Sequence, residues 1–255
     1  MNPPANILVF DTAEQVAGAA AERFVAYSRV SIREHGTFAV SLAGGSTPRR
    51  AYELLGTDAF KSRVDWSGVH LFFGDERMVP PDSLESNYRM VNEALLSRVA
   101  IPGENVNRIP GEVEPSASAE SYEAELKSFF GNVNWPRFDL VLLGMGNDGH
   151  TASLFPASDA LQEKTKWVVA TTQPQTKQDR ITLTLPVLNH AARIAFLVTG
   201  KEKAATLARV LRGVVASREL PAQAITPVNG VLEWLVDRSA LPRSSSARNQ
   251  ADRTQ

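Results

Sequence analysis

The sequence contains no cysteine among its 255 residues. This absence excludes disulfide bonds, a catalytic thiolate, and any zinc or iron–sulfur site built on cysteine ligands. No apolar run approaches the length of about 20 residues that spans a bilayer, and the start, Met1-Asn2-Pro3-Pro4, is not a basic segment followed by an apolar one. We therefore expect no membrane anchor, no signal peptide and a cytoplasmic protein.

The chain also lacks an excess of charge, because 27 Lys and Arg stand against 28 Asp and Glu, a net charge of −1. Nucleic-acid-binding and polybasic membrane-surface proteins carry a basic excess, so we expect neither kind of partner. No composition shift or internal repeat divides the chain, and we predict a single domain over residues 3–238. Residues 239–255 are rich in Ser, Arg, Asn and Gln and predict a disordered tail.

Short apolar runs alternate with segments of helical periodicity. The predicted strands are Ile7–Phe10, Phe38–Leu42, Val69–Phe73, Phe138–Leu143, Val168–Thr171, Ile181–Leu185 and Ile194–Val198. The predicted helices are Ala13–Glu34, Pro48–Leu55, Asn87–Val99, Ser118–Phe130 and Lys201–Leu211. This alternation indicates an α/β fold with a mostly parallel, buried sheet, plus a small antiparallel or mixed element near Val168–Leu185.

Ligands of open α/β sheets bind beyond the carboxyl ends of the strands, so the loops after the strands are informative. The first combines Gly44 and Gly45 with the hydroxyls of Ser46 and Thr47, and Pro48 suits the first helical position. Free N–H groups and the helix dipole could hold a phosphate there. A simple turn with an N-cap explains the same residues. No Gly-Lys-Ser/Thr follows, so this is not a triphosphate-binding loop.

The second loop, Gly74-Asp75-Glu76-Arg77, places charges at a strand end, where they are costly to leave unpaired. Arg77 could clamp a phosphate or stabilise developing negative charge. A surface turn with a local ion pair is the alternative.

The third loop, Gly144 to Thr151, matches G-x-G-x-x-G, but Pro156 follows within two turns and the next strand ends without an acid. Both features argue against a dinucleotide site. What remains is Asp148 beside His150, and an imidazole with an ordinary pKa near ~6.5 is a ready general base. The other histidines lack such a setting.

The fourth loop is Thr199-Gly200-Lys201, in which a cation at a helix start opposes the dipole unless an anion also binds there. A solvated lysine is the alternative, and Arg180 is a further cationic candidate. The chain has neither the G-x-S-x-G nor the H-E-x-x-H pattern, so neither a serine nucleophile nor a metal-activated water is supported.

Together these loops resemble those of the 6-phosphogluconolactonases. The matching segments are Ser41–Pro48, Phe73–Arg77, Leu143–Pro156, Arg180–Thr184 and Val198–Lys201, in family order and over most of the chain up to about Leu235. The glucosamine-6-phosphate deaminases of the same superfamily share the first loop and the Asp-Gly-His core. They have Asp-Glu-Tyr in place of Asp75-Glu76-Arg77, and a catalytic Glu that is missing from Thr151–Pro156.

The resemblance implies a three-layer α/β fold of the NagB/RpiA/CoA transferase-like type and hydrolysis of 6-phospho-D-glucono-1,5-lactone to 6-phosphogluconate. Gly44, Gly45, Ser46, Thr47, Asp75, Arg180 and Lys201 would bind the substrate. His150, Asp148 and Arg77 would form the catalytic group, with His150 as general base. We expect no metal, no organic cofactor, and a monomer or weak homodimer. The alternatives are a deaminase-type isomerase and a non-catalytic sugar-phosphate sensor.

Overall fold

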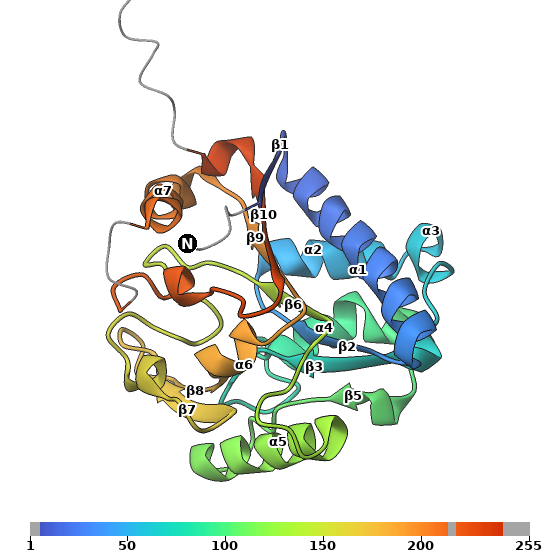
Figure 1. Cartoon of the computed structure of the whole chain (residues 1–255), viewed down its shortest axis with the longest axis horizontal. Helices are drawn as coiled ribbons and strands as arrows, with labels where there is room; N and C mark the ends of the chain where they lie inside the picture. Colours follow the sequence, from blue (N-terminus) through green and yellow to red (C-terminus); the bar gives the residue numbers. More distant parts are fainter. Residues whose placement is uncertain (1–5, 214–217, 242–255) are drawn as a thin grey trace, which may run out of the picture.

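A seven-stranded parallel sheet runs through the centre of the computed structural model, which describes residues 6–213 and 218–241 (Figure 1). In spatial order its strands are β1 (Asn6–Phe10), β10 (Val231–Asp237), β9 (Arg193–Val198), β6 (Leu140–Leu143), β2 (Phe38–Leu42), β3 (Val69–Phe73) and β5 (Val106–Asn107). Every residue of β2 and β6 is buried, which explains their continuous apolar sequences.

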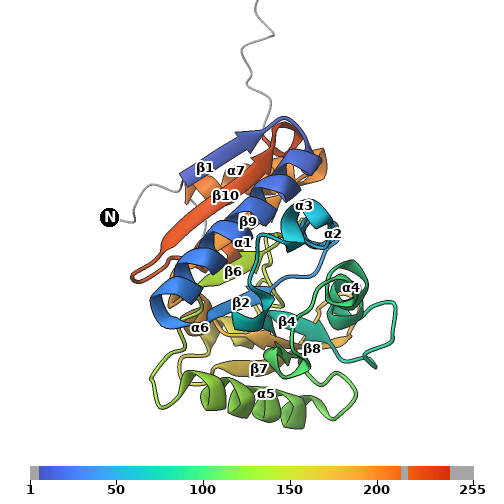
Figure 2. The ribbon, with the colours of Figure 1, turned by 90° about the vertical axis from the view of Figure 1, so that its right-hand side faces the viewer.

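Helices complete a three-layer arrangement. They are α1 (Ala13–His35), α2 (Ser46–Leu55), α3 (Asp58–Lys61), α4 (Asn87–Ala94), α5 (Pro115–Phe130), α6 (Leu185–Asn189) and α7 (Ala204–Arg212). In Figures 1 and 2, α1 and α2 lie along one face of the large sheet, in contact with β9. Figure 1 shows α6 and α7 on the other side. The predicted three-layer α/β fold is confirmed.

A small antiparallel sheet lies beside the large one and consists of β4 (Asp75–Arg77), β8 (Asp179–Leu183) and β7 (Val168–Thr172). The predicted small mixed element is therefore confirmed, but residues 75–77 form its third strand rather than a loop. Gly74 joins the two sheets, because its N–H donates to Leu42 O at 2.9 Å and its carbonyl accepts from Leu183 N at 2.9 Å. The site therefore receives side chains from both sheets.

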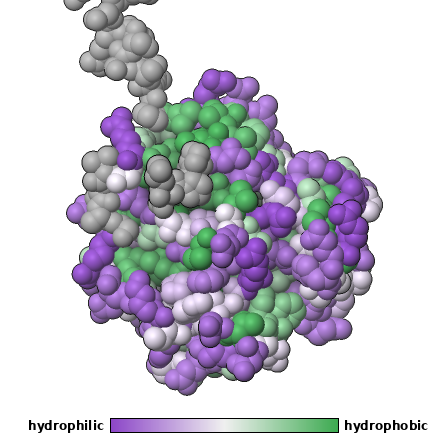
Figure 3. Space-filling view, viewed as in Figure 1, coloured by the Kyte–Doolittle hydropathy of each residue, from purple (hydrophilic) through white to green (hydrophobic). Residues whose placement is uncertain are grey.

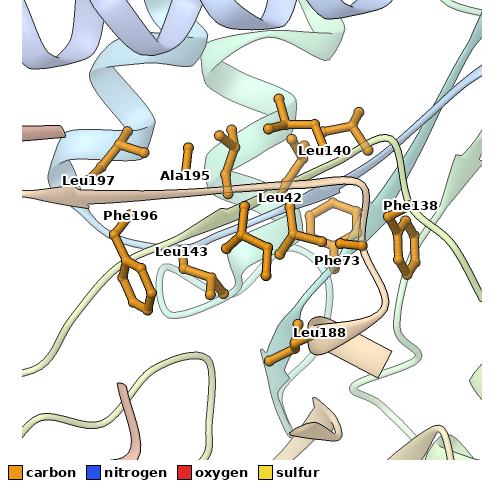
Figure 4. Close-up of a cluster of buried hydrophobic side chains, with 14 of the residues drawn as sticks. Leu42, Phe73, Phe138, Leu140, Leu143, Leu188, Ala195, Phe196 and Leu197 are labelled. Carbon is orange, nitrogen blue, oxygen red and sulfur yellow. The ribbon is translucent and has the colours of Figure 1, made fainter. Parts of the chain in front are cut away.

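The core lies on both faces of the large sheet. Figure 4 shows Ala195 and Leu197 pointing to one face of β9 and Phe196 to the other, as the alternation of a strand requires. The ring centroids of Phe24 in α1 and Phe38 in β2 lie 5.2 Å apart, edge to face. Those of Phe72 in β3 and Phe138 lie 5.4 Å apart, also edge to face. Buried aromatic rings of this kind fix the strands on which the loops stand.

Strand β10 was not predicted from the sequence, because Glu233 interrupts its apolar run. The structure pairs this carboxylate with Arg23 of α1, at 2.6 Å from Oε2 to Nε. This ion pair compensates the charge of Glu233, which stands in a strand flanked by two others.

Several helix boundaries differ from the prediction, and α5, for example, begins at Pro115 rather than Ser118. The predicted helix Asn87–Val99 ends at Ala94 and is followed by a 3₁₀-helix, Leu96–Arg98. Helix α2 begins at Ser46, so Pro48 stands in its third position rather than its first. Helix α7 begins at Ala204, after a 3₁₀-turn over Lys201–Lys203.

The predicted tail also begins too early, because Ser239 and Ala240 belong to a 3₁₀-helix and Ala240 is fully buried. The remainder of that segment, 242–255, lies outside the described residues. The single domain over residues 3–238 stays a prediction.

The surface is mostly hydrophilic, with apolar groups between, one of them near the top of Figure 3. Among the described residues, Ile7 and Val9 of the edge strand β1 and the neighbouring Val231 are exposed large hydrophobic side chains. No helix in the part of the chain that is described is long and apolar enough to cross a membrane.

Candidate active site

A polar pocket of about 500 Å³ opens at the carboxyl ends of β2, β3, β6, β9 and β10. All four loops singled out in the sequence contribute to its lining, including Gly44, Arg77, His150 and Gly200. This is the edge at which ligands of parallel α/β sheets bind, and the volume suits a small molecule.

The first loop presents the amino end of α2 to the pocket. Gly45 caps the helix without a side-chain hydrogen bond, and Ser46 and Thr47 occupy its first two positions. Gly44 approaches Asn87 so closely that a Cβ there would lie 2.2 Å from Asn87 Oδ1. The predicted residues Gly44, Gly45, Ser46 and Thr47 all line the pocket, with free helix N–H groups at hand.

Asp75, Glu76 and Arg77 divide between two faces of β4. The carboxylate of Glu76 accepts from the backbone N–H groups of Asn87 and Tyr88 and so caps α4. Burial raises the pKa of Glu76, and those N–H groups oppose the shift. Glu76 is therefore structural, whereas Asp75 and Arg77 face the pocket.

Asp75 is a buried carboxylate, 9% exposed, at the pocket wall. Its Oδ2 accepts from Ser153 Oγ at 2.7 Å, and Asn87 Nδ2 donates to its backbone oxygen at 2.9 Å. A carboxylate can accept about four hydrogen bonds, so Asp75 can still accept from ligand hydroxyls.

The third loop holds His150 and Asp148 as a pair. His150 Nδ1 lies 2.6 Å from Asp148 Oδ1, and both side chains are about one third exposed. Burial alone would raise the pKa of Asp148, but the hydrogen bond and charge of His150 hold that pKa below its ordinary value. An ionised Asp148 only accepts, so His150 Nδ1 carries the hydrogen and Nε2 is left as the acceptor.

The backbone around this pair has little freedom. A Cβ on Gly146 would lie 2.1 Å from His150 Nδ1, so only glycine allows the ring this position. The carbonyl of His150 accepts from Gly146 N at 2.8 Å, and Thr151 Oγ1 donates to Gly144 O at 2.9 Å. Ala152, which also lines the pocket, has a positive φ of 46°. The loop is thereby fixed in a shape that presents the imidazole.

The fourth loop supplies a lysine, but a different one from the one predicted. Lys201 is exposed and outside the pocket lining, whereas Lys203 is half-buried and lines it. Burial lowers the pKa of Lys203, and the charges of Glu202 and Asp148 oppose the shift. The sequence does not distinguish Lys201 from Lys203, because the 3₁₀-turn determines which of the two side chains faces the pocket.

Two other pocket residues, Thr199 and Asp237, were given no role from the sequence because their signals are weak. Thr199 Oγ1 lies 2.7 Å from Thr47 Oγ1 and joins the fourth loop to the first. Asp237, at the end of β10, accepts from Gly200 N at 3.1 Å. Arg180 stands opposite Arg77 in the β4–β8 register but does not line the pocket. The described residues hold no group of three or more His, Asp or Glu suited to a metal ion.

Comparison with known proteins gives a consistent result. Residues 11–234 match the model of a family described as glucosamine-6-phosphate isomerases/6-phosphogluconolactonase. The 6-phosphogluconolactonase of Haemophilus influenzae is 38% identical over 236 residues, 92% of this chain and 98% of that protein. The 6-phosphogluconolactonase of Nostoc is 39% identical over 213 residues, 82% and 86% of the two chains.

Solved structures agree with the sequence relatives. The structure of the Trypanosoma brucei 6-phosphogluconolactonase has a TM-score of 0.82 at 31% identity and covers 94% of this chain and 98% of its own. A monomeric glucosamine-6-phosphate deaminase, at 21% identity and a TM-score of 0.77, shares the fold.

Proposed function

Because the chain belongs to the glucosamine-6-phosphate isomerase/6-phosphogluconolactonase family, we propose that it hydrolyses 6-phospho-D-glucono-1,5-lactone to 6-phosphogluconate. This reaction is the second step of the oxidative pentose phosphate pathway. The supporting observation is that one pocket is lined both by His150, which is hydrogen-bonded to Asp148, and by the amino end of α2 with Lys203. A single six-carbon substrate can contact both.

The phosphate binds where α2 begins. The N–H groups of Ser46 and Thr47, the dipole of the helix and the ammonium of Lys203 together complement a dianion. Lys203 takes the role that the sequence suggested for Lys201. Asp75 and Asn87, which also line the pocket, accept from and donate to the sugar hydroxyls.

Hydrolysis uses His150 as the general base. Its Nε2 removes a proton from water as the water oxygen bonds to the lactone carbonyl carbon, and Asp148 stabilises the imidazolium. Arg77 stabilises the oxyanion that forms. The bond from the carbonyl carbon to the ring oxygen then breaks, and the imidazolium returns the proton to that oxygen. The new carboxylic acid loses its own proton to solvent.

The test is a lactone-hydrolysis assay corrected for the spontaneous reaction. We expect His150→Ala to lower kcat by roughly 10²–10⁴, the range for loss of a general base. His35→Gln is the control, because His35 is exposed at the end of α1 and is expected to keep full activity. Near wild-type turnover in His150→Ala would remove His150 from the chemical step.

Three further outcomes bear on the activity itself. A wild-type rate no higher than the spontaneous rate would contradict the lactonase proposal, and inactivation by a metal chelator would contradict its metal-free chemistry. Ammonia release from glucosamine 6-phosphate would instead indicate a deaminase, and none is expected.

A further inference from the structure

Two arginines face each other across the small sheet. Arg77 of β4 and Arg180 of β8 are register partners in an antiparallel pair, so their side chains lie on the same face. Asp75 and Thr182, the next pair on that face, are buried. Asp75 and Arg77 line the pocket, so the face that carries both arginines is on the pocket's side, with Arg180 just outside the pocket lining.

These guanidiniums are short of partners. Within the described part of the chain, the Nε atoms of both arginines are buried and have no hydrogen-bond partner. The guanidinium of Arg77 donates to the backbone oxygen of Glu85, and among the described residues no carboxylate forms a salt bridge with either arginine. Buried donors are nearly always satisfied in folded proteins, so two unsatisfied ones side by side call for an explanation.

The pair is also electrostatically unfavourable on its own. Like charges directly opposite in a sheet repel, and half-burying a guanidinium removes part of its hydration. Burial lowers the pKa of Arg180 and the charge of Arg77 lowers it further, whereas the charges of Asp75, Glu76 and Glu85 oppose the shift. An anion held between the two forks would satisfy both donors and remove the repulsion.

We propose that Arg77 and Arg180 form a second anion subsite, which takes the carboxylate that ring opening creates on the product. The inference rests on the proposed lactonase function. The lactone carries one anionic group, its phosphate, whereas the hydrolysed product carries two, at opposite ends of a six-carbon chain. The product is therefore held at both ends and the substrate at one.

The phosphate has a different place in the pocket. Thr47 and Thr199, which are hydrogen-bonded to each other, and Lys203 belong to loops of the large sheet. The charges that act on Lys203 are Glu202 and Asp148, whereas those that act on Arg180 include Arg77 and Asp75. The two cationic groups therefore have different charged neighbours, and we assign one anion to each.

The test compares three non-reacting ligands by calorimetry on the full chain: 6-phosphogluconate, with both anions; glucitol 6-phosphate, with the phosphate alone; and gluconate, with the carboxylate alone. Wild-type protein should bind 6-phosphogluconate the most tightly. Arg180→Gln should weaken that binding by about 10- to 100-fold, the loss expected for a charge-assisted contact, and leave glucitol 6-phosphate unchanged. Arg180→Lys should restore part of it, since a lysine keeps the charge without the fork.

Two controls separate this role from a structural one. Lys177→Gln removes the same charge from an exposed position on the same hairpin and should leave all three affinities unchanged. Without ligand, Arg180→Gln should melt close to wild type, because losing the repulsion from Arg77 offsets losing the attraction to Asp75, Glu76 and Glu85. A lower melting temperature with unchanged ligand preference would assign Arg180 to structure alone and overturn the proposal.

Two other outcomes test the carboxylate assignment and the lactonase function separately. Equal weakening of 6-phosphogluconate and glucitol 6-phosphate would place the phosphate at the arginines and overturn the carboxylate assignment. No lactone turnover by the wild type would refute the proposed function separately, because the binding measurements need no turnover.

Discussion

Lys201 and Lys203 differ by two positions, and only Lys203 reaches the pocket. We expect Lys203→Ala to raise KM for the phosphorylated lactone by about 10-fold or more while hardly changing turnover of unphosphorylated gluconolactone, because a charge-assisted contact to the phosphate is lost. Lys201→Ala is the matched control and should change neither. Steady-state kinetics with both lactones checks this, and a larger effect at Lys201 would restore the assignment made from sequence.

The charge of Lys203 also gives a pH dependence with a definite sign. Burial holds the pKa of Lys203 below 10.5 in the free protein, so the ammonium is lost as pH rises through that lowered value. An anion binds the protonated form better, so the affinity for 6-phosphogluconate should fall across that range. In Lys203→Arg the affinity should not change over the same pH range, since arginine keeps its charge. Calorimetric titrations at several alkaline pH values distinguish the two proteins, and parallel profiles would contradict the assignment.

The role of a residue could be predicted where its loop holds one side chain of that kind, and not where it holds two of the same charge. Asp148 and His150 could be named because their glycine-rich loop contains no other titratable groups. Glu76 carries the same charge as Asp75 and stands beside it, yet it caps α4 while Asp75 faces the pocket. Asp75 and Glu76 face opposite sides because side chains alternate along β4. From the sequence these residues are predicted to form a loop, and their roles could therefore not be separated.

At the scale of the elements, two buried tyrosines fix the ends of neighbouring strands. The hydroxyl of Tyr52 accepts from Ala43 N and donates to Ala43 O, both at 3.0 Å. Tyr122 does the same at Phe73, at 2.8 and 3.0 Å. Each satisfies a backbone pair at the point where its strand leaves the sheet.

Removing either hydroxyl should therefore be costly. We expect Tyr52→Phe and Tyr122→Phe each to lower the free energy of unfolding by about 1–3 kcal/mol, because two buried backbone groups lose their partner. Tyr27→Phe, which loses one half-buried contact to Glu233 at 3.3 Å, should cost less. Urea denaturation measures all three, and equal losses would refute the special role of the strand ends.

Element prediction succeeded where local signals suffice. Helix α1 is capped at its start by Thr12, whose side chain accepts from Gln15 N, and at its end by Gly36 with a φ of 85°, so its bounds are close to the predicted ones. Strand β10 was not predicted, because Glu233 is tolerated inside the sheet through its ion pair with Arg23, which is 210 positions away in the sequence. A partner at that distance leaves no mark on local periodicity.

At the scale of the whole molecule, the two sheets share one pocket and are joined at Gly74 and by the contact between Ser153 and Asp75. We expect a single cooperative thermal transition by calorimetry, as the single-domain prediction requires. Saturation with 6-phosphogluconate at about 100 times Kd should add about 2.7 kcal/mol of stability, or about 5–10 °C in Tm. Two resolved transitions, only one of them shifted by ligand, would contradict the prediction.

The position of β10 has a consequence for how the molecule is made. β10 lies between β1 and β9, with Asn6 paired to Glu233 and Val231 to Arg193. Of the strands that the structure describes, β1 leaves the ribosome first and its neighbour β10 last, so β1 stays unpaired while nearly all of the chain between them is synthesised. The native sheet, and with it the wall that Asp237 gives to the pocket, closes only after translation has passed residue 237.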